Sequence, residues 1–253
     1  MDHRTEIVEP ARMSAAARRA LIDDLYACHD RIFAGVSRAQ FAAYVVDSPA
    51  RRTRIMVLRD REGRARGYAA FHVFEQMHLG RRSVVIRMES GVEPAFRGRK
   101  LFSRFVLANV LWTVLRSPTR PIWFFACFVH PSAYVSCIRH APELWPRPGE
   151  EAPASMTGLM QSVVEAFHMT PTDRPGVFQV GWITRGAHAP GRVCPEAAWY
   201  MDRNPGYLDG HGLLTVMPVS LNHLAAAALS VARSRLARLF AYPAISNAPV
   251  GST

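Results

Sequence analysis

The apolar residues of this chain change their spacing along its length, and each spacing predicts an element. After a short strand at 5–8, apolar residues recur at helical spacing at Leu21, Leu25, Cys28 and Ile32. This spacing predicts a helix that Ser14 caps and Gly35 ends. Ser37 and Gln40 stand in capping-box register before a second, shorter helix. Two helices therefore precede the first strong strands.

Three apolar runs follow, at 54–59, 67–74 and 83–92, with turn residues between them. Short turns between consecutive strands favour antiparallel pairing, so these runs predict a three-stranded meander. The next helix is expected to begin near residue 101. Its apolar stripe consists of Leu101, Phe105, Ala108, Trp112 and Leu115. We expect this stripe to pack on the sheet.

The second half of the chain has a less regular pattern. The apolar run 122–129 predicts a strand buried on both faces, and 132–140 predicts a helix. Residues 142–153 are rich in Pro, Glu and Gly, which predicts a surface connection and no folded element. Four further elements are expected, namely helices at 155–168 and 221–240 and strands at 177–183 and 213–219. The two strands are expected to be sheet partners.

The composition is that of a folded, basic protein. With 253 residues, 49% of them hydrophobic, the chain is long enough to bury one large core. A formal charge of +11 favours anionic partners such as nucleotide cofactors, acidic carrier proteins, nucleic acid or anionic membranes. Arginine is used almost to the exclusion of lysine, which a GC-rich genome would also produce. Charge alone therefore does not choose among these partners.

The cysteines and the N-terminus bear on the compartment. Four cysteines are widely spaced without a Cys-x-x-Cys pair, so neither a disulfide framework nor a metal site is predicted. The N-terminal residues lack the apolar stretch of a secretory signal. The most apolar long window, 213–232, is interrupted by polar residues and Pro218, which argues against a membrane-spanning helix. A cytoplasmic protein is expected.

Candidate chemistry begins where a strand runs directly into a helix, at 92–101. Such a junction directs unpaired backbone N–H groups and the positive end of the helix dipole at one point, which favours phosphate binding. Lys100, the only lysine of the chain, stands inside this turn.

The element order and this junction resemble the GCN5-related N-acetyltransferase (GNAT) superfamily of acyl-CoA-dependent acyltransferases. In that family a bulged strand precedes the turn Arg/Gln-x-x-Gly-x-Gly/Ala, whose backbone amides hold the pyrophosphate of coenzyme A. The six corresponding residues here are Arg97, Gly98, Arg99, Lys100, Leu101 and Phe102, after Val92 of a Val-x-Pro lead-in. Arg97 and Gly98 fit the pattern. Lys100 and Phe102 stand where the family keeps small residues.

This departure leaves two interpretations open. Lys100 would bind the pyrophosphate directly as a point charge, or Phe102 fills the space and the coenzyme site is lost or altered. The cluster of Arg97, Arg99 and Lys100 favours retained binding, because like charges held together need an anion nearby. An exposed basic helix start without a ligand is the remaining alternative.

The resemblance also implies a catalytic arrangement around the same strand. The backbone N–H of Val92 would polarise the thioester carbonyl. Glu89 is the best candidate for the base that takes the ammonium proton. The alternative is a solvated carboxylate paired with Arg87 or Arg81. Weaker candidates on the neighbouring strand are Glu75, His72 and His78.

A second landmark of the family is an Asn-x-x-Ala that begins the next helix, followed by a Tyr that protonates the leaving thiolate. In this chain His130 replaces the Asn, Ala133 matches, and Cys137 stands where the Tyr is usual. Tyr134, three residues before Cys137, would reach the same helix face. Catalytic roles for Tyr134 and Cys137 compete with simple packing.

The pattern and the resemblance together predict an α/β (α+β) protein with a mixed, mostly antiparallel central sheet flanked by helices. Residues 1–145 would form the GNAT-like core. Residues 146–253 would complete the sheet within one continuous domain and add an inserted helix and a C-terminal amphipathic helix. The expected function is acyl transfer from acyl-CoA, or from an acidic acyl carrier protein, to a small-molecule amine or amino acid. A catalytically inactive binding or scaffold protein is the alternative.

Other partners follow from the charge and the apolar residues. Nucleic-acid binding is disfavoured, because the arginines are scattered and no zinc finger or basic–aromatic platform accompanies them. The C-terminal helix would lie on an anionic membrane surface, such as the inner membrane, or pack at a homodimer interface. The aromatic residues Trp112, Trp123, Phe124 and Phe125 would permit a long-chain acyl tunnel, with the core as their alternative place.

Overall fold

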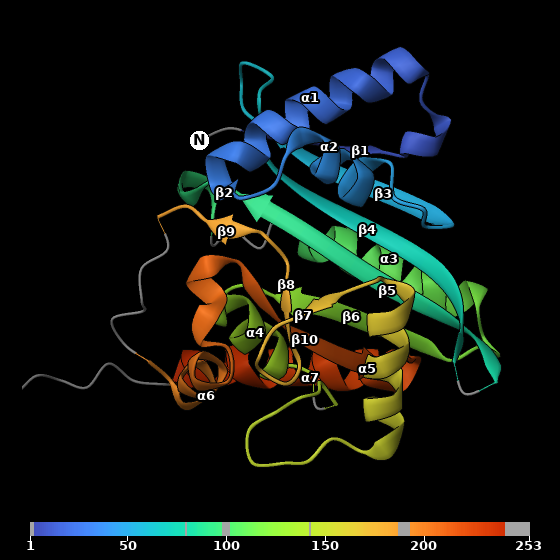
Figure 1. Cartoon of the computed structure of the whole chain (residues 1–253), viewed down its shortest axis with the longest axis vertical. Coiled ribbons are helices and arrows are strands. Elements are labelled where there is room, and N and C mark those ends of the chain that lie inside the picture. The colour runs from blue at the N-terminus through green and yellow to red at the C-terminus, as the bar shows by residue number, and fades with distance from the viewer. Residues whose placement is uncertain (1–2, 79, 98–101, 142, 187–192, 241–253) are drawn as a thin grey trace, which may run out of the picture.

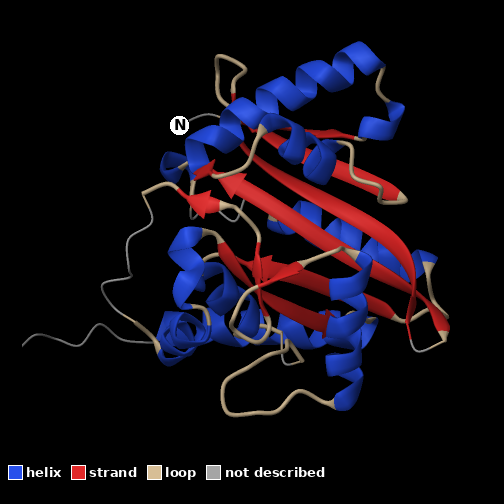
Figure 2. Ribbon diagram, viewed as in Figure 1, coloured by secondary structure: helices blue, strands red, loops and turns tan. Residues whose placement is uncertain are grey.

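A twisted sheet runs through the middle of the molecule, with helices on both faces (Figures 1 and 2). The computed structural model describes residues 3–78, 80–97, 102–141, 143–186 and 193–240, and the side chains of the last helix as far as Arg233. Within these described ranges the main sheet has eight strands, in the order β1-β3-β4-β5-β6-β10-β8-β7. Neighbours are antiparallel except for β5 and β6, which are parallel. The predicted fold class, a mixed and mostly antiparallel sheet flanked by helices, is confirmed.

The strands of the main sheet are β1 (Arg4–Val8), β3 (Arg52–Arg59), β4 (Ala65–His78), β5 (Arg81–Val92), β6 (Ile122–Phe128), β7 (Thr170–Pro171), β8 (Val177–Gln179) and β10 (His211–Pro218). A separate pair is formed by β2 (Phe33–Ala34) and β9 (Ile183–Thr184). The helices are α1 (Ala15–Ile32), α2 (Arg38–Phe41), α3 (Ser103–Arg116), α4 (Pro131–Ile138), α5 (Ala154–Ala166), α6 (Pro195–Arg203) and α7 (Leu221–Phe240). Short 3₁₀ helices occur at Pro10–Arg12, Pro94–Phe96 and Pro205–Asp209, and a short π-helix occurs at Ala42–Val46.

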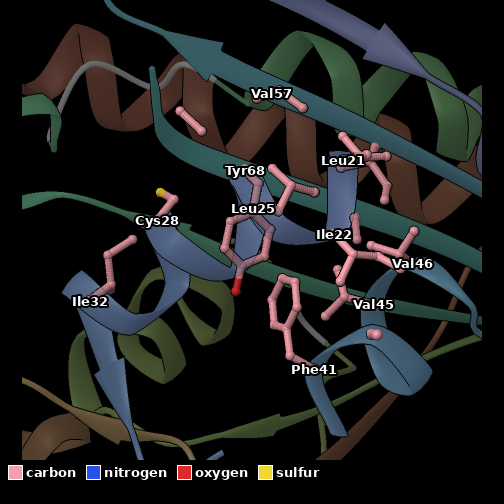
Figure 3. Close-up of a cluster of buried hydrophobic side chains, with 14 of the residues drawn as sticks. Leu21, Ile22, Leu25, Cys28, Ile32, Phe41, Val45, Val46, Val57 and Tyr68 are labelled. Atoms are coloured by element: carbon pink, nitrogen blue, oxygen red, sulfur yellow. The ribbon is translucent and has the colours of Figure 1, made fainter. Parts of the chain in front are cut away.

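Helix α1 forms as its apolar spacing predicts. The Ser14 hydroxyl accepts a hydrogen bond from the Ala17 N–H at 3.2 Å, and the predicted capping box at Ser37 and Gln40 is also present. The apolar side of α1 packs with α2 against one face of the sheet, where Tyr68 of β4 is fully buried (Figure 3). Helix α5 covers the same face farther along, and α3, α4 and α7 cover the opposite face.

The predicted apolar stripe of α3 is only partly confirmed, because Phe105 is buried on the sheet but Ala108 is exposed. Trp112 and Leu115 are 40% and 63% exposed, whereas Asn109 and Thr113 face the sheet and are buried. The two polar residues tolerate burial because they bond within the helix: Asn109 Nδ2 donates to the Phe105 carbonyl and Thr113 Oγ1 to the Asn109 carbonyl, each at 2.7 Å. Leu101 of the predicted stripe lies outside the described residues.

The second half departs from the expected pattern in three places. The predicted strand 177–183 divides at Gly181, which has a positive φ of 77°, so that β8 joins the main sheet and β9 pairs with β2. The predicted surface connection is partly folded, because Leu144 is buried and Trp145 exchanges backbone hydrogen bonds with Val216 of β10. Helix α6, which no pattern predicted, packs on α4.

Buried Asn204 joins α6 to the start of β10. Its Nδ2 donates to the Tyr200 hydroxyl and to the His211 carbonyl, both at 3.0 Å. Because Asn204→Ala leaves both acceptors buried without this donor, we expect the free energy of unfolding in urea to fall by about 1–3 kcal/mol. Asn222→Ala, at an exposed position of α7, should change it by less than about 0.5 kcal/mol. Equal values for the two variants would contradict this role of Asn204.

Helix α7 has the predicted bounds and an apolar outer side. Leu221 and Leu229 are 54% and 51% exposed, and Arg233 is also exposed. Among the described residues, none of the helices combines the length and apolarity needed to cross a bilayer. Contact of α7 with an anionic membrane surface stays a prediction. Vesicle co-sedimentation with and without the residues after 220 tests it, and equal pelleting would contradict it.

Candidate functional site

Strands β5 and β6 separate at one end, and this separation creates the candidate site. They pair in parallel only from Val84 with Ile122 to Arg87 with Phe125. Strand β5 then continues to Val92 along β4, while β6 continues to Phe128 along β10. Beyond Arg87, none of the described strands therefore pairs with the edge of β5 that faces β6.

The hydrogen-bond alternation of the β4–β5 pair sets the direction of the Val92 N–H. The neighbouring Glu93 N–H donates to the Arg66 carbonyl of β4 at 3.0 Å. Because consecutive residues of an antiparallel strand direct their N–H groups to opposite sides, the Val92 N–H points away from β4 and into the separation. The Val92 carbonyl accepts a hydrogen bond from Arg97 Nε at 3.0 Å.

The resemblance implied a bulge in this strand, and that expectation is wrong. The β4–β5 register runs without a shift from His78 paired with Arg81 to Gly67 paired with Val92. The Val92 N–H is released because β6 diverges, and no extra residue in β5 is needed. The sequence pattern did not distinguish these two causes.

A large apolar pocket lies on the α3 face of the separated strands. Its volume is about 680 Å³, and β5, β6, β10, α3, α4 and α7 all line it; we call it the α3–α7 pocket. Four predicted site residues line this pocket: Val92, Arg97, Phe102 and Cys137. Phe102 packs on the core beside it, and the pocket remains open next to this side chain. Gly98, Arg99, Lys100 and Leu101 lie outside the described residues.

Cys137 faces the α3–α7 pocket as a neutral thiol. Burial raises the pKa of Cys137 to about 11. A free thiol has a pKa of about 8.5, so proton transfer from Cys137 to a departing thiolate would be uphill. The structure therefore favours the packing alternative for Cys137.

Two further predicted residues, His130 and Tyr134 of the α4 region, do not line this pocket. His130 caps α4, where its Nδ1 accepts from the Ser132 N–H at 3.2 Å, and burial and the charge of Arg97 lower its pKa. Tyr134 does not reach the pocket. Its hydroxyl donates to the Pro146 carbonyl at 3.1 Å, and its ring stacks on Trp199. The structure therefore favours a packing role for Tyr134 as well, because its hydroxyl is bonded to Pro146 in the folded part of the 143–153 connection.

A second, smaller pocket lies on the opposite face of β6. It has a volume of about 230 Å³ and is lined by Tyr44, Phe125, Cys127, Phe167 and Trp182 among others; we call it the Tyr44 pocket. Phe124 lines the α3–α7 pocket and Phe125 lines the Tyr44 pocket. Side chains alternate between the faces of a strand, so the two pockets flank β6 from opposite sides.

Glu89 belongs to a buried charged cluster next to the Tyr44 pocket. Its carboxylate lies 2.5 Å from Arg87 Nε and 2.8 Å from His72 Nε2. The Arg87 guanidinium stacks 3.8 Å from the Tyr44 ring centre and donates to the Tyr44 carbonyl at 2.6 Å. Thr53 Oγ1 lies 2.9 Å from His72 Nδ1 and extends the cluster. The expected partner Arg87 is confirmed, but Glu89 is only 8% exposed and so is not solvated.

Two opposing effects act on the ionisation of Glu89. Burial by itself raises the pKa of this carboxyl, but the charge of Arg87 and the contact with His72 outweigh burial, and the pKa is lowered. Glu89 is therefore a carboxylate at neutral pH.

The sequence singled out some groups of this face and missed others. Glu75 is exposed and pairs with Arg51 and Arg120 away from the cluster, and buried His78 contacts Trp123 and Ser162. Arg87 and Glu89 are two residues apart on a buried strand, so strand alternation would have predicted that they share a face. Tyr44 and Cys127 are far apart in sequence, so no local pattern could have predicted that they line the same pocket.

The structure also bears on metal binding. Within the described ranges, no three His, Cys, Asp or Glu side chains lie close enough together to hold a metal ion. The four cysteines are free thiols.

The comparisons with known proteins give a distant likeness. The sequence matches no protein-family model and no curated protein. Several solved structures of acetyltransferases are similar to this chain at low sequence identity. A GCN5-related N-acetyltransferase from Kribbella flavida is 12% identical with a TM-score of 0.39, over 85% of this chain and 98% of that one. NAA60 of Arabidopsis thaliana, solved in complex with acetyl-CoA, is 10% identical with a TM-score of 0.39, over 86% and 98%.

A GNAT-family acetyltransferase from Streptococcus pneumoniae is 10% identical with a TM-score of 0.37, over 86% of this chain and 100% of that one.

Proposed function

We propose that this chain is an acyltransferase that moves an acyl group from acyl-CoA to an amine acceptor. One observation carries the proposal: the end of β5 directs the Val92 N–H into a separation that has the α3–α7 pocket on one face, while the Tyr44 pocket lies on the opposite face of the neighbouring strand β6. A two-substrate reaction needs such access from both sides, because donor and acceptor must meet at one carbonyl carbon.

The geometry assigns one substrate to each face. The donor enters the α3–α7 pocket, and its phosphates lie at the turn before α3, where Arg97 supplies a cation. The thioester carbonyl accepts a hydrogen bond from the Val92 N–H. The acceptor amine approaches from the Tyr44 pocket. Its nitrogen bonds to the carbonyl carbon, the carbon–sulfur bond breaks to release the coenzyme A thiolate, and the ammonium proton passes to Glu89 through one water, because the carboxylate itself does not line this pocket.

The retained pocket beside Phe102 favours binding over the inactive scaffold alternative. Phe102 packs on the core and forms one wall, so it replaces a small residue without filling the site. An acidic acyl carrier protein remains the second candidate donor. The formal charge of +11 would speed its encounter with this chain.

Calorimetric titration with acetyl-CoA and coenzyme A tests the donor assignment. We expect Arg97→Ala to weaken coenzyme binding about tenfold, the cost of one charge-assisted hydrogen bond. Lys100→Ala tests the sequence-based interpretation of the turn in the same way. Arg116→Ala is the matched control, because Arg116 is an exposed arginine at the other end of α3. No heat with acetyl-CoA or a long-chain acyl-CoA would overturn the proposal and favour the scaffold alternative.

A further inference from the structure

We infer that the α3–α7 pocket holds a long aliphatic acyl chain, so that the donor is a long-chain acyl thioester and not acetyl-CoA. The inference rests on the proposed function, because it names the substrate class of the same donor site. It starts from the size of the pocket. Protein interiors are close-packed, with few voids larger than a water molecule. A hollow of about 680 Å³ is the size of a site for a whole ligand, far larger than an acetyl group needs.

The chemistry of the inner wall selects the ligand. Ile86, Met88, Phe124, Val219 and Leu224 line it, and none of these side chains offers a hydrogen bond. The pantetheine arm of coenzyme A contains amide groups, and their burial without partners would cost several kcal/mol. An alkyl chain has no such groups and gains free energy for each methylene that it buries. The inner pocket therefore suits the acyl part of the donor and not its pantetheine part.

The positions of the lining residues along β5 place the acyl chain relative to the reacting carbonyl. Val92, Arg97 and Phe102 lie at the end where β5 is unpaired, and Ile86 lies six residues back along β5. Six residues of strand span about 20 Å. A zigzag chain with carbon–carbon bonds of about 1.5 Å covers that length with on the order of fifteen carbons. A chain attached at the Val92 N–H thus fits along β5 toward Ile86.

Helix α7 is the element that closes this space. Leu224, Ala227 and Val231 recur at helical spacing and line the pocket, whereas Ala228 and Leu229 point outward. Polar contacts tie α7 to the segment around α4: His223 Nε2 lies 3.1 Å from Glu143 Oε1, and Ser230 Oγ donates to the Arg139 carbonyl at 3.2 Å. Helix α7 is therefore held over the pocket by contacts within the protein, without a ligand.

The direct test measures affinity against chain length. Isothermal titration compares acetyl-CoA, octanoyl-CoA and dodecanoyl-CoA, and free dodecanoate is titrated separately. Each buried methylene contributes at most about fourfold in Kd, equivalent to about 0.8 kcal/mol. We expect dodecanoyl-CoA to bind at least roughly a hundredfold more tightly than acetyl-CoA. We also expect dodecanoate alone to bind, since the acyl site needs no coenzyme.

Two neighbouring alanines of α7 give a matched pair of variants. Ala227→Phe puts a ring into the pocket and should reduce the gain from acetyl-CoA to dodecanoyl-CoA by at least about tenfold. Ala228→Phe adds the same ring on the exposed side and should leave the gain as in the unmodified chain. Val231→Phe provides a second filling variant, should the first not fold.

The outcomes separate this inference from the proposed function. Equal affinity for acetyl-CoA and dodecanoyl-CoA, without binding of dodecanoate, would overturn the long-chain inference and leave acyl-CoA binding intact. Binding of dodecanoate without binding of any CoA ester would support the acyl site and overturn the coenzyme assignment. A chain-length gain that Ala227→Phe and Ala228→Phe reduce equally would place the chain outside this pocket.

Discussion

Glu89→Gln is expected to lower kcat/KM for acyl transfer by at least about a hundredfold while the affinity for the acyl-CoA donor stays unchanged. The amide keeps the size of the carboxylate but cannot take the ammonium proton. The donor binds on the other face of β5, so its affinity should not depend on this side chain. Release of free coenzyme A thiol, followed with a thiol reagent, measures the rate, and calorimetry measures donor binding.

The same substitution also disturbs the buried cluster, so the experiment must separate rate from stability. Glu89→Gln leaves the Arg87 guanidinium buried without its counter-charge, which typically costs about 3–5 kcal/mol of unfolding free energy. Replacing both charges, in Arg87→Met with Glu89→Gln, removes the uncompensated charge. Such double replacements are often neutral for stability. We expect the double variant to be more stable than the single one and equally inactive.

Glu75→Gln serves as the matched control on the neighbouring strand. Glu75 is an exposed carboxylate whose partners, Arg51 and Arg120, lie away from the Glu89 cluster. Its loss should leave the rate within about twofold, as for most surface changes. A folded Glu89→Gln variant that retains the full rate would refute the assignment of Glu89 as the base.

The sequence predicts most of the fold because most elements carry a local signal. Helix α1 has an apolar face and a serine cap, and β3, β4 and β5 are long apolar runs with turn residues between them. The pattern failed for helix α3 because its sheet-facing side carries two polar residues: Thr113 and the Asn109 amide N–H bond within the helix, and Asn109 Oδ1 accepts from Arg54 of β3. Helix α6 and β9 were missed, because their place depends on contacts with α4 and β2 that lie far away in sequence.

The candidate site was predictable to the extent that one strand and one turn define it. Glu89, Val92 and Arg97 all lie on β5 or just after it, and the structure places them around the separation of β5 and β6. Helix α7 lines the α3–α7 pocket, and Tyr44 lines the pocket named after it. Neither has a spacing relationship to β5, so only the folded chain shows them.

The expected tunnel aromatics show the same limit. Phe124 lines the α3–α7 pocket, but Phe125 lines the Tyr44 pocket, and Trp112 lies partly exposed on α3 with Arg52 over its ring. The number of large apolar residues in a sequence indicates that the core can contain a cavity. It does not show where the cavity lies. Strand alternation between Phe124 and Phe125 is what assigns each aromatic to a substrate.

A buried histidine in the α1 core is expected to make the fold sensitive to mild acid. His29 is 1% exposed, its Nδ1 lies 2.8 Å from the Tyr68 hydroxyl, and the rings of Phe41 and Trp182 pack around it. Burial lowers the pKa of His29 to about 4, although nearby Asp30 raises it slightly. In the unfolded chain the same group titrates near 6.5.

Proton uptake by the unfolded chain sets the direction in which stability changes with pH. Between pH 6.5 and 4 the unfolded chain binds a proton at His29 that the folded chain does not, so acid favours unfolding. Full stability is present above pH 6.5, and on acidification the loss builds up until pH falls below 4. From pH 7 to pH 5 we expect this one group to remove about 2 kcal/mol of unfolding free energy, measured by urea denaturation at each pH.

Two variants isolate the contribution of His29. His29→Leu removes the titrating group, so its loss of stability between pH 7 and pH 5 should be about 2 kcal/mol smaller than that of the unmodified chain. Tyr68→Phe removes the hydrogen-bond partner but keeps the buried imidazole, so it should lower stability at both pH values and retain the pH dependence. If His29→Leu kept the full pH dependence, the acid sensitivity would have to arise from other groups, because a leucine cannot bind the proton.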